Sequence, residues 1–269
     1  MTTKFDGEGQ RRKRVTFDEV ADDYEARPPY PASLYELLVA ERGVGAGCAV
    51  VEIGPGTGQL TIPLLDLGCE VTAVELGPRL SHRLRQRTSG RAVRVVTSAF
   101  EDVVLAEDTF DLVVSATAFH WVDPEVGIPK ASRLLRPGGW FVLLWNVFGD
   151  LDRSDPFHDA LSEMLRRLEP EIAAPMVPGV TSPDGHSWAA VIDDHLLFEP
   201  AEVDVFRWTG THSTAELRAL FATFSTWISR GPERKELLLD ELTRIADEQF
   251  DGRVSRPYQT VVVSARKAR

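Results

Sequence analysis

The sequence predicts an α/β fold in which a mostly parallel sheet is covered by helices on both faces. Short runs rich in valine and isoleucine alternate with longer segments of helical periodicity through residue 148. The first such run, residues 49–53, leads directly into a loop with glycine at positions 54, 56 and 58, and the second ends in an acid, Glu75. Parallel strands joined by helices bind ligands at their carboxyl ends, so a ligand site is expected at this edge of the sheet.

The expected elements follow one another in a regular order. The valine-rich and isoleucine-rich runs predict strands at residues 49–53, 71–75, 92–96, 110–115 and 140–145. Pro78 opens the helix after the second strand, because proline is favoured in the first turn of a helix. Pro63 falls early in the helix after the glycine loop, where it is tolerated if it also lies in the first turn. Helices are expected in the other gaps.

The alternation of strand and helix stops after Asn146. Residues 149–197 contain an amphipathic stretch at 156–168, and prolines at positions 170, 175, 178 and 183 follow it with few apolar residues between them. This composition predicts a flap. Beyond it, a strand is expected at residues 202–209, helices at 214–229 and 233–249, and a last strand at 258–264.

Length and charge narrow the classes of function. The 269 residues, 43% of them hydrophobic, suit one large core with an added cap. The 41 acidic and 30 basic residues give a net charge of −11, which makes nucleic acid a poor first partner. Cys48 and Cys69 lack metal-ligand spacing and are expected as reduced core thiols. No signal-like or membrane-spanning run is apparent, so a cytoplasmic protein is expected, with residues 1–16 as a disordered tail.

The spacing of the glycine loop indicates the kind of ligand. Glycines let the chain turn sharply off the strand, adopt positive φ angles and bring a ligand close to the backbone amides. A dinucleotide fingerprint requires G-x-G-x-x-G, and Gln59 stands where its third glycine would be. The spacing is instead acid-x-G-x-G-x-G, beginning at Glu52. An NAD-dependent oxidoreductase is therefore disfavoured.

Residues 52–58 resemble motif I of the class I S-adenosylmethionine-dependent methyltransferases. Residues 70–75, 98–102, 110–115 and 134–140 agree in order with further segments of that family. The resemblance implies that Glu75 accepts hydrogen bonds from both ribose hydroxyls, which suits an acceptor-only carboxylate, and that residues 98–102 form the adenine-side loop. The cofactor-binding residues implied in this way are Glu52, Gly54, Pro55, Gly56, Gly58, Glu75, Leu76, Ala99, Phe100, Glu101, Ser115 and Ala116.

The same resemblance implies the overall layout. The family fold is a Rossmann-like, doubly wound, seven-stranded sheet with helices on both faces and a helical cap inserted after strand five. Residues 17–148 would form the cofactor-binding core with an amino-terminal lid, residues 149–197 the cap insertion, and residues 198–269 the strands and helices that complete the sheet. The motifs are specific through residue 148, and beyond it only the layout is similar.

The segment before the first strand is the expected lid. Val20, Tyr24 and Arg27 recur at helical spacing, and Pro28 and Pro29 end this helix. In the family, an aromatic residue and an arginine in this position lie over the methionine end of the cofactor, whose carboxylate suits the donor fork of arginine. The alternative is that Tyr24 packs and that Arg27 is a solvated helix end.

Three residues after the fourth strand are expected on the acceptor side: Phe119, His120 and Trp121. His120 is a candidate general base, because imidazole titrates near neutral pH, and a cofactor-shell or packing role is the alternative. Trp121 would either cover the sulfonium through a cation–π contact or pack in the core. The remaining histidines show no metal-ligand pairing, so no metal is expected.

Together these features predict an enzyme that transfers a methyl group from S-adenosyl-L-methionine to a small-molecule acceptor by direct in-line displacement, leaving S-adenosyl-L-homocysteine. No Asn-Pro-Pro-Tyr, Asp-Pro-Pro-Tyr or Pro-Cys motif points to methylation of DNA bases. The alternative is a regulatory or interaction protein that binds the cofactor under a closed cap without transferring the methyl group. The sequence leaves the acceptor and the oligomeric state open.

Overall fold

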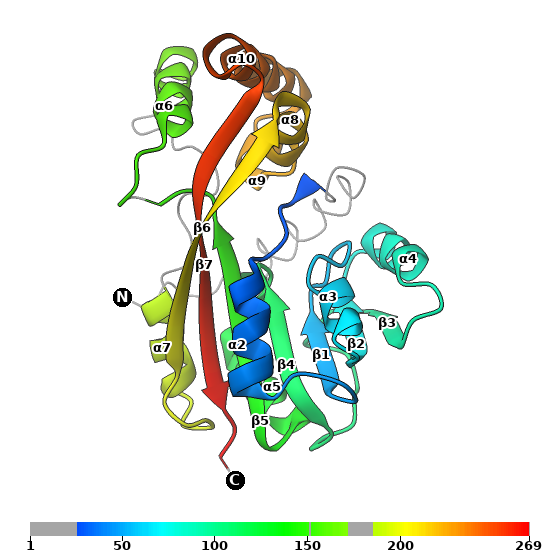
Figure 1. Ribbon diagram of the computed structural model, residues 1–269. Coiled ribbons are helices and arrows are strands. Elements are labelled where there is room, and N and C mark those ends of the chain that lie inside the picture. Colours follow the sequence, from blue (N-terminus) through cyan, green and yellow to red (C-terminus); the bar gives the residue numbers. More distant parts are fainter. Residues whose placement is uncertain (1–25, 151, 172–184, 269) are drawn as a thin grey trace.

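The computed structural model describes residues 26–150, 152–171 and 185–268, and its centre is a seven-stranded sheet (Figure 1). The strand order is β3-β2-β1-β4-β5-β7-β6. The first five strands pair in parallel, whereas β7 runs antiparallel to both β5 and β6. The strands are β1 (Ala49–Ile53), β2 (Glu70–Glu75), β3 (Val93–Thr97), β4 (Phe110–Ala116), β5 (Leu135–Val147), β6 (Glu202–Ser213) and β7 (Arg253–Arg266).

Helices cover both faces of this sheet, as the sequence predicts. On one face, α2 (Ala32–Arg42), α3 (Thr61–Asp66) and α4 (Pro78–Arg87) pack against alternate strand residues such as Val50 and Val114. On the other face, α5 (Pro124–Leu134) and α7 (Gly185–Asp193) pack against the intervening residues, such as Val51 and Val113. The largely apolar pattern of the central strands follows from this burial on two sides.

The last two strands extend past the rest of the sheet. Residues 259–266 of β7 pair with β5, but residues 253–258 pair only with β6, and the two strands continue there as a ribbon. Figure 1 shows this ribbon rising from the sheet toward α6 (Pro156–Leu168), α8 (Thr214–Ala222), α9 (Ser225–Ile228) and α10 (Pro232–Phe250). We call these four helices the cap. They share an apolar core of their own with the ribbon residues Val254 and Tyr258.

Two buried interactions fix the cap to the sheet. Arg256 of β7 is fully buried, pairs with Asp155 at 2.8 Å and donates to the carbonyl of Phe148 at 3.0 Å. Asp155 also caps α6 by accepting from the backbone N–H of His158 at 3.0 Å. One carboxylate therefore joins the start of α6 to the β7 strand of the ribbon.

Several element boundaries differ from the sequence prediction. The two helices described between residues 149 and 197 pack in different places: α6 belongs to the cap, whereas α7 packs against β6 and β7 on the sheet face. The helix expected at residues 214–229 is broken at Thr223, whose hydroxyl bonds the Leu220 carbonyl, and at Phe224, which is extended and buried. The fifth strand begins at Leu135, which pairs with Phe110 ahead of a bulge. The expected disordered tail lies outside the described residues.

Candidate functional site

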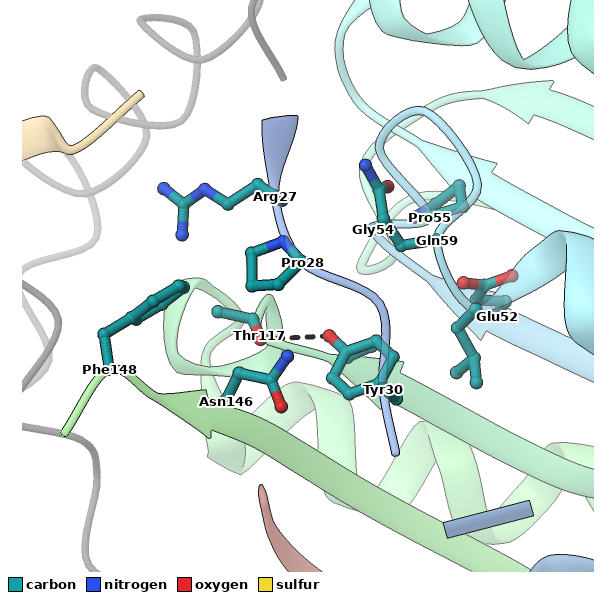
Figure 2. Close-up of a pocket in the computed structure, with 12 residues that line it drawn as sticks. Arg27, Pro28, Tyr30, Glu52, Gly54, Pro55, Gln59, Thr117, Asn146 and Phe148 are labelled. Atoms are coloured by element: carbon teal, nitrogen blue, oxygen red, sulfur yellow. Dashed lines mark hydrogen bonds between the residues drawn. The ribbon is translucent and has the colours of Figure 1, made fainter. Parts of the chain in front are cut away.

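A pocket lies at the carboxyl ends of β1, β4 and β5 (Figure 2). It encloses about 430 Å³ of empty space, part of it open to solvent. The chain segments that meet there are the stretch before α2, the glycine loop after β1, and the ends of β4 and β5. The lining residues are Arg27, Pro28, Tyr30, Glu52, Gly54, Pro55, Gln59, Leu60, Ala116, Thr117, Asn146 and Phe148.

The glycine loop has the backbone geometry that the sequence predicts. Gly54, Gly56 and Gly58 all have positive φ angles, of 66°, 57° and 98°. A Cβ on Gly54 would lie 2.5 Å from the Cβ of Ala118, which follows β4. Only glycine therefore lets the loop after β1 approach the loop after β4 this closely.

The carboxylate of Glu75 holds the glycine loop in place. Its Oε2 accepts from the backbone N–H of Gly56 at 3.0 Å, and its Oε1 accepts from the N–H of Gly77 at 2.9 Å. A carboxylate has further lone pairs for a ligand, so these bonds leave the predicted ribose contact open. The sequence points to an acid here, but the bond across to Gly56 depends on the tertiary fold.

Glu52 is the most buried acid of the pocket, with 1% of the residue exposed. Its Oε2 accepts from the Thr61 hydroxyl at 2.6 Å, and its Oε1 has no hydrogen-bond partner. Burial raises the pKa of the Glu52 carboxyl to about 7; the Thr61 hydrogen bond opposes this rise and the charge of Glu75 adds to it. An unsatisfied buried carboxylate oxygen at a pocket wall fits a cationic ligand group.

The amino-terminal stretch bridges the pocket and the cap. Arg27 donates from Nη2 to the carbonyl of Thr223 at 3.0 Å, and its guanidinium lies 4.9 Å from the ring of Phe224. Tyr30 and Thr117 exchange a hydrogen bond between their hydroxyls at 3.2 Å. Arg27 therefore contacts both the pocket and the cap, while the predicted partner Tyr24 lies outside the described residues.

The loop after β3 lies beside Glu75, as the adenine-side prediction requires. The backbone N–H of Ser98 donates to the Glu75 carbonyl at 2.9 Å. Lys130 of α5 is buried and donates to the carbonyls of Glu101, at 3.1 Å, and Val103. Its ammonium also lies 5.3 Å from the ring of Phe100. Phe100 is itself buried in the core, so the loop offers its backbone and the half-buried Ala99 rather than this ring.

Two residues predicted for the site have fully buried side chains. Ser115 is fully buried and donates to the carbonyl of Ile53 at 3.0 Å, so it joins β4 to β1 and does not line the pocket. Phe119 is also fully buried and packs edge-on against Phe141 and Trp188, at 5.2 and 5.7 Å. The sequence alone does not show whether a phenylalanine after a strand faces a ligand or the core. Here the ring of Phe119 packs in the core.

His120 and Trp121 form the short helix η2 (Phe119–Trp121) together with Phe119. His120 Nδ1 accepts from the indole N–H of Trp145 at 3.4 Å, and its ring lies 4.8 Å from that of Trp121. Neither residue lines the pocket. An indole nitrogen only donates, so Nδ1 must be the acceptor and the neutral imidazole carries its proton on Nε2.

Sequence reasoning missed several lining residues: Pro28, Tyr30, Gln59, Leu60, Thr117, Asn146 and Phe148. Thr117 has a φ of 56°. This backbone conformation is costly for a β-branched residue, and residues held in such conformations cluster at functional sites. Asn146 could have been predicted from the sequence, because it is a polar residue near the end of an apolar strand, at the ligand edge of the sheet.

Comparisons with known proteins show similarity to methyltransferases. Residues 51–143 match the methyltransferase domain family. An uncharacterised methyltransferase of Mycobacterium tuberculosis is 35% identical over 139 residues, which cover 51% of this chain and 55% of that protein. The match thus spans about half the length of that relative. An uncharacterised methyltransferase-like protein of Schizosaccharomyces pombe is 27% identical over 258 residues, covering 94% of this chain and 95% of its own.

Solved structures share the fold. A protein described as a type II methyltransferase from Anaeromyxobacter dehalogenans aligns with a TM-score of 0.62 and 21% identity, covering 89% of this chain and 97% of its own. A phosphoethanolamine N-methyltransferase of Haemonchus contortus, in complex with phosphomonomethylethanolamine and S-adenosylhomocysteine, aligns with a TM-score of 0.51 and 14% identity, covering 87% and 53%.

Within the described residues, no helix is long and apolar enough to cross a membrane, and no group of His, Cys, Asp and Glu is arranged to hold a metal ion. The glycine loop that begins at Glu52, the mixed seven-stranded sheet and the domain match at residues 51–143 all point the same way. They make the chain similar to methyltransferases, in sequence over residues 51–143 and in fold over the described residues.

Proposed function

We propose that the protein transfers a methyl group from S-adenosylmethionine to a small molecule bound between the end of β5 and the cap. The observation that carries this proposal is the pocket itself. It joins the glycine loop, where a nucleoside would bind, to Asn146 and Phe148 at the end of β5.

The residues present fit the cofactor. The unsatisfied Oε1 of Glu52 suits an ammonium such as that of the methionine moiety. Glu75 keeps acceptor capacity for the ribose hydroxyls, and the loop held by Lys130 would flank the adenine. A relative of the same fold is known with S-adenosylhomocysteine bound, which supports this assignment.

The bound cofactor would supply an electrophilic methyl group on a sulfonium. The acceptor lone pair forms the new bond to the methyl carbon as the carbon–sulfur bond breaks, and sulfur keeps that electron pair. An acceptor that carried a proton then loses it. The chain positions the acceptor and excludes water under the cap, which is the main demand of a direct displacement. His120 can take up a proton only at Nδ1, after the hydrogen bond from Trp145 is given up.

The alternative is a protein that binds the cofactor without transfer, and it requires a cap that leaves no acceptor space. The pocket extends past the glycine loop to Phe148, whose ring packs edge-on against Phe224 of the cap at 5.1 Å. The extension of the pocket lining toward the cap favours the enzyme over the binding protein.

Calorimetric titration with S-adenosylhomocysteine and NAD, followed by a methyl-transfer screen with labelled cofactor, tests the proposal. Glu75→Gln should weaken S-adenosylhomocysteine binding by about 2 kcal/mol, the scale of hydrogen bonds to a charged group. Glu70→Gln is the matched control, because Glu70 is exposed at the opposite end of the same strand. Binding of NAD, or equal affinity in both variants, would contradict the cofactor assignment.

A further inference from the structure

Asn146 ends β5 at the pocket wall and is held by a chain of buried hydrogen bonds. Its Oδ1 accepts from the Thr260 hydroxyl at 2.6 Å. Thr260, on β7, is 0% exposed, and its hydroxyl also contacts the indole Nε1 of Trp208 on β6 at 3.0 Å. The ring of Trp208 is fixed in turn by stacking on Tyr258, with centroids 4.6 Å apart. Three adjacent strands thus contribute to the position of one amide.

The chemistry of the donors and acceptors gives these hydrogen bonds a direction. An indole N–H can only donate, so the Thr260 oxygen accepts from Trp208, and the Thr260 hydroxyl donates in turn to Oδ1 of Asn146. The atom of Asn146 that accepts this hydrogen bond must be the carbonyl oxygen, which leaves the NH₂ group on the pocket side. Figure 2 shows this nitrogen turned toward Thr117 and Tyr30, with the amide oxygen pointing away.

The NH₂ group retains donor capacity. One of its hydrogens goes to the carbonyl of Pro29 at a long 3.4 Å. Among the described residues, no protein atom accepts the second hydrogen. Beside it lie the hydroxyls of Tyr30 and Thr117, which share a hydrogen bond at 3.2 Å.

The strand order puts Asn146 on the acceptor side of the pocket. The glycine loop and Glu75 belong to β1 and β2, whereas β5 is separated from β1 by β4. Two strand spacings are about 10 Å, so Asn146 stands well away from the loop that would hold the nucleoside. The cation-binding Glu52 and the donor Asn146 therefore stand at different ends of one pocket.

We propose that Asn146, oriented by Thr260 and Trp208, selects methyl acceptors that carry a hydrogen-bond-accepting oxygen next to the methylated atom. This proposal rests on the proposed function. The acceptor oxygen receives the second N–H of Asn146, and the hydroxyl pair of Tyr30 and Thr117 lies beside it. Acceptors that offer only an ammonium or an apolar group at this position leave the amide unsatisfied, which costs binding free energy.

The test compares variants on a panel of matched acceptors: carboxylic acids and catechols, each beside the amine of the same skeleton, with labelled S-adenosylmethionine. Asn146→Asp keeps the shape and the bond from Thr260 but replaces the donor by an anionic oxygen. It should lower kcat/KM for the oxygen-bearing acceptors roughly 10-fold to 100-fold, mainly through KM. The dissociation constant of S-adenosylhomocysteine, measured calorimetrically, should stay within about twofold of wild type, well below that loss.

The positioning role has its own variants. Thr260→Val removes the hydroxyl that fixes the amide and should reproduce most of the Asn146→Asp loss, whereas Thr260→Ser should restore wild-type kinetics. Thr88→Val is the matched control, because Thr88 is equally buried and its hydroxyl bonds only the Leu84 carbonyl, at 2.7 Å. A merely structural role would lower stability in both valine variants without separating acids from amines.

The failures are distinguishable. If wild type does not bind S-adenosylhomocysteine, the proposed function and this inference both fall. If it binds, but Asn146→Asp weakens that binding as much as it weakens turnover, Asn146 belongs to the cofactor and the inference is wrong. Unchanged preference for acids over amines in Asn146→Asp, or transfer in wild type to amines alone or to no member of the panel, would also overturn it.

Discussion

Two carboxylates near the ends of the neighbouring strands β1 and β2 differ in how fully their oxygens are hydrogen-bonded. Glu75 accepts backbone N–H bonds on both oxygens, whereas Glu52 has one oxygen bonded to Thr61 and one unsatisfied. The hydrogen bonding of Glu52 is therefore left for a bound ligand to complete. Its raised pKa, about 7, means that the free protein carries a proton there in mildly acidic solution.

Binding of an ammonium next to Glu52 should expel this proton. The ligand charge favours the carboxylate, so S-adenosylhomocysteine should bind more tightly as pH rises from about 5 toward 7 and then level off. Calorimetry near pH 6 in buffers of different ionisation enthalpy should report release of up to about one proton per ligand, and almost none near pH 8. Glu52→Gln should abolish the buffer dependence. The same proton count in that variant would assign the release to another group.

The raised pKa of Glu52 also makes the free energy of unfolding depend on pH. The pKa of Glu52 is raised above its unfolded value of 4.5, so its contribution to stability is full below that pH and is lost as pH rises to about 7. The free energy of unfolding of Glu52→Gln should therefore gain on that of wild type across this interval. Urea unfolding at the two ends of the interval measures it. A constant difference between the two proteins would show that Glu52 titrates normally.

At the level of elements, two glycines distinguish the two costs of adding a side chain: backbone strain and a steric clash. Gly54 has a φ of 66° and a Cβ there would meet Ala118, whereas Gly43, which ends α2, has a φ of 69° and no atom within 4 Å of such a Cβ. Gly43→Ala should thus cost only backbone strain, about 1 kcal/mol. Gly54→Ala adds the clash and should lose more stability, together with S-adenosylhomocysteine affinity. Chemical denaturation and calorimetry on both variants decide this, and equal effects would remove the role of close approach.

The loop after β3 depends on one buried ammonium. Lys130→Met keeps the length of the side chain but leaves the carbonyls of Glu101 and Val103 without their donor. We expect S-adenosylhomocysteine to bind about 10-fold more weakly, the scale of one lost charged hydrogen bond. Lys235→Met on α10 is the control, because Lys235 lies in the cap. Unchanged affinity in Lys130→Met, with lowered stability, would make Lys130 a purely structural residue.

Features that depend on residue type and local spacing could be predicted from the sequence, and the structure confirms them. The strand alternation and the positive-φ glycines follow from residue type and spacing, and each is found where expected. The break at Thr223 and the core position of Phe119 were not predictable, because each depends on partners distant in sequence. The bond from Gly56 to Glu75 and the Asn146 chain fall in the same class, since they cross strands whose pairing the sequence does not specify.

For the whole molecule, the pairing of Arg256 with Asp155 joins the cap to the sheet. Removing one member of a buried pair leaves an uncompensated charge, so Arg256→Met should lower the free energy of unfolding by about 3–5 kcal/mol. Adding Asp155→Asn should recover part of the loss, since asparagine still caps α6. Arg218→Met is the control: Arg218 pairs with Glu236 and Asp240 on the surface and should cost less than about 1 kcal/mol. Equal losses in both arginine variants would contradict the linking role.

The β6–β7 ribbon has a consequence for how such a protein diversifies. Ser213 and Arg253 face each other as the last pair of the ribbon, and the chain between them forms α8, α9 and α10. A segment whose two ends meet can be lengthened, shortened or exchanged without displacing the strands that carry it. Related genes could therefore trade residues 214–252 and acquire new acceptors while the nucleoside end stays as it is. For the same reason, this pair of residues marks the natural joint for chimaeras between family members.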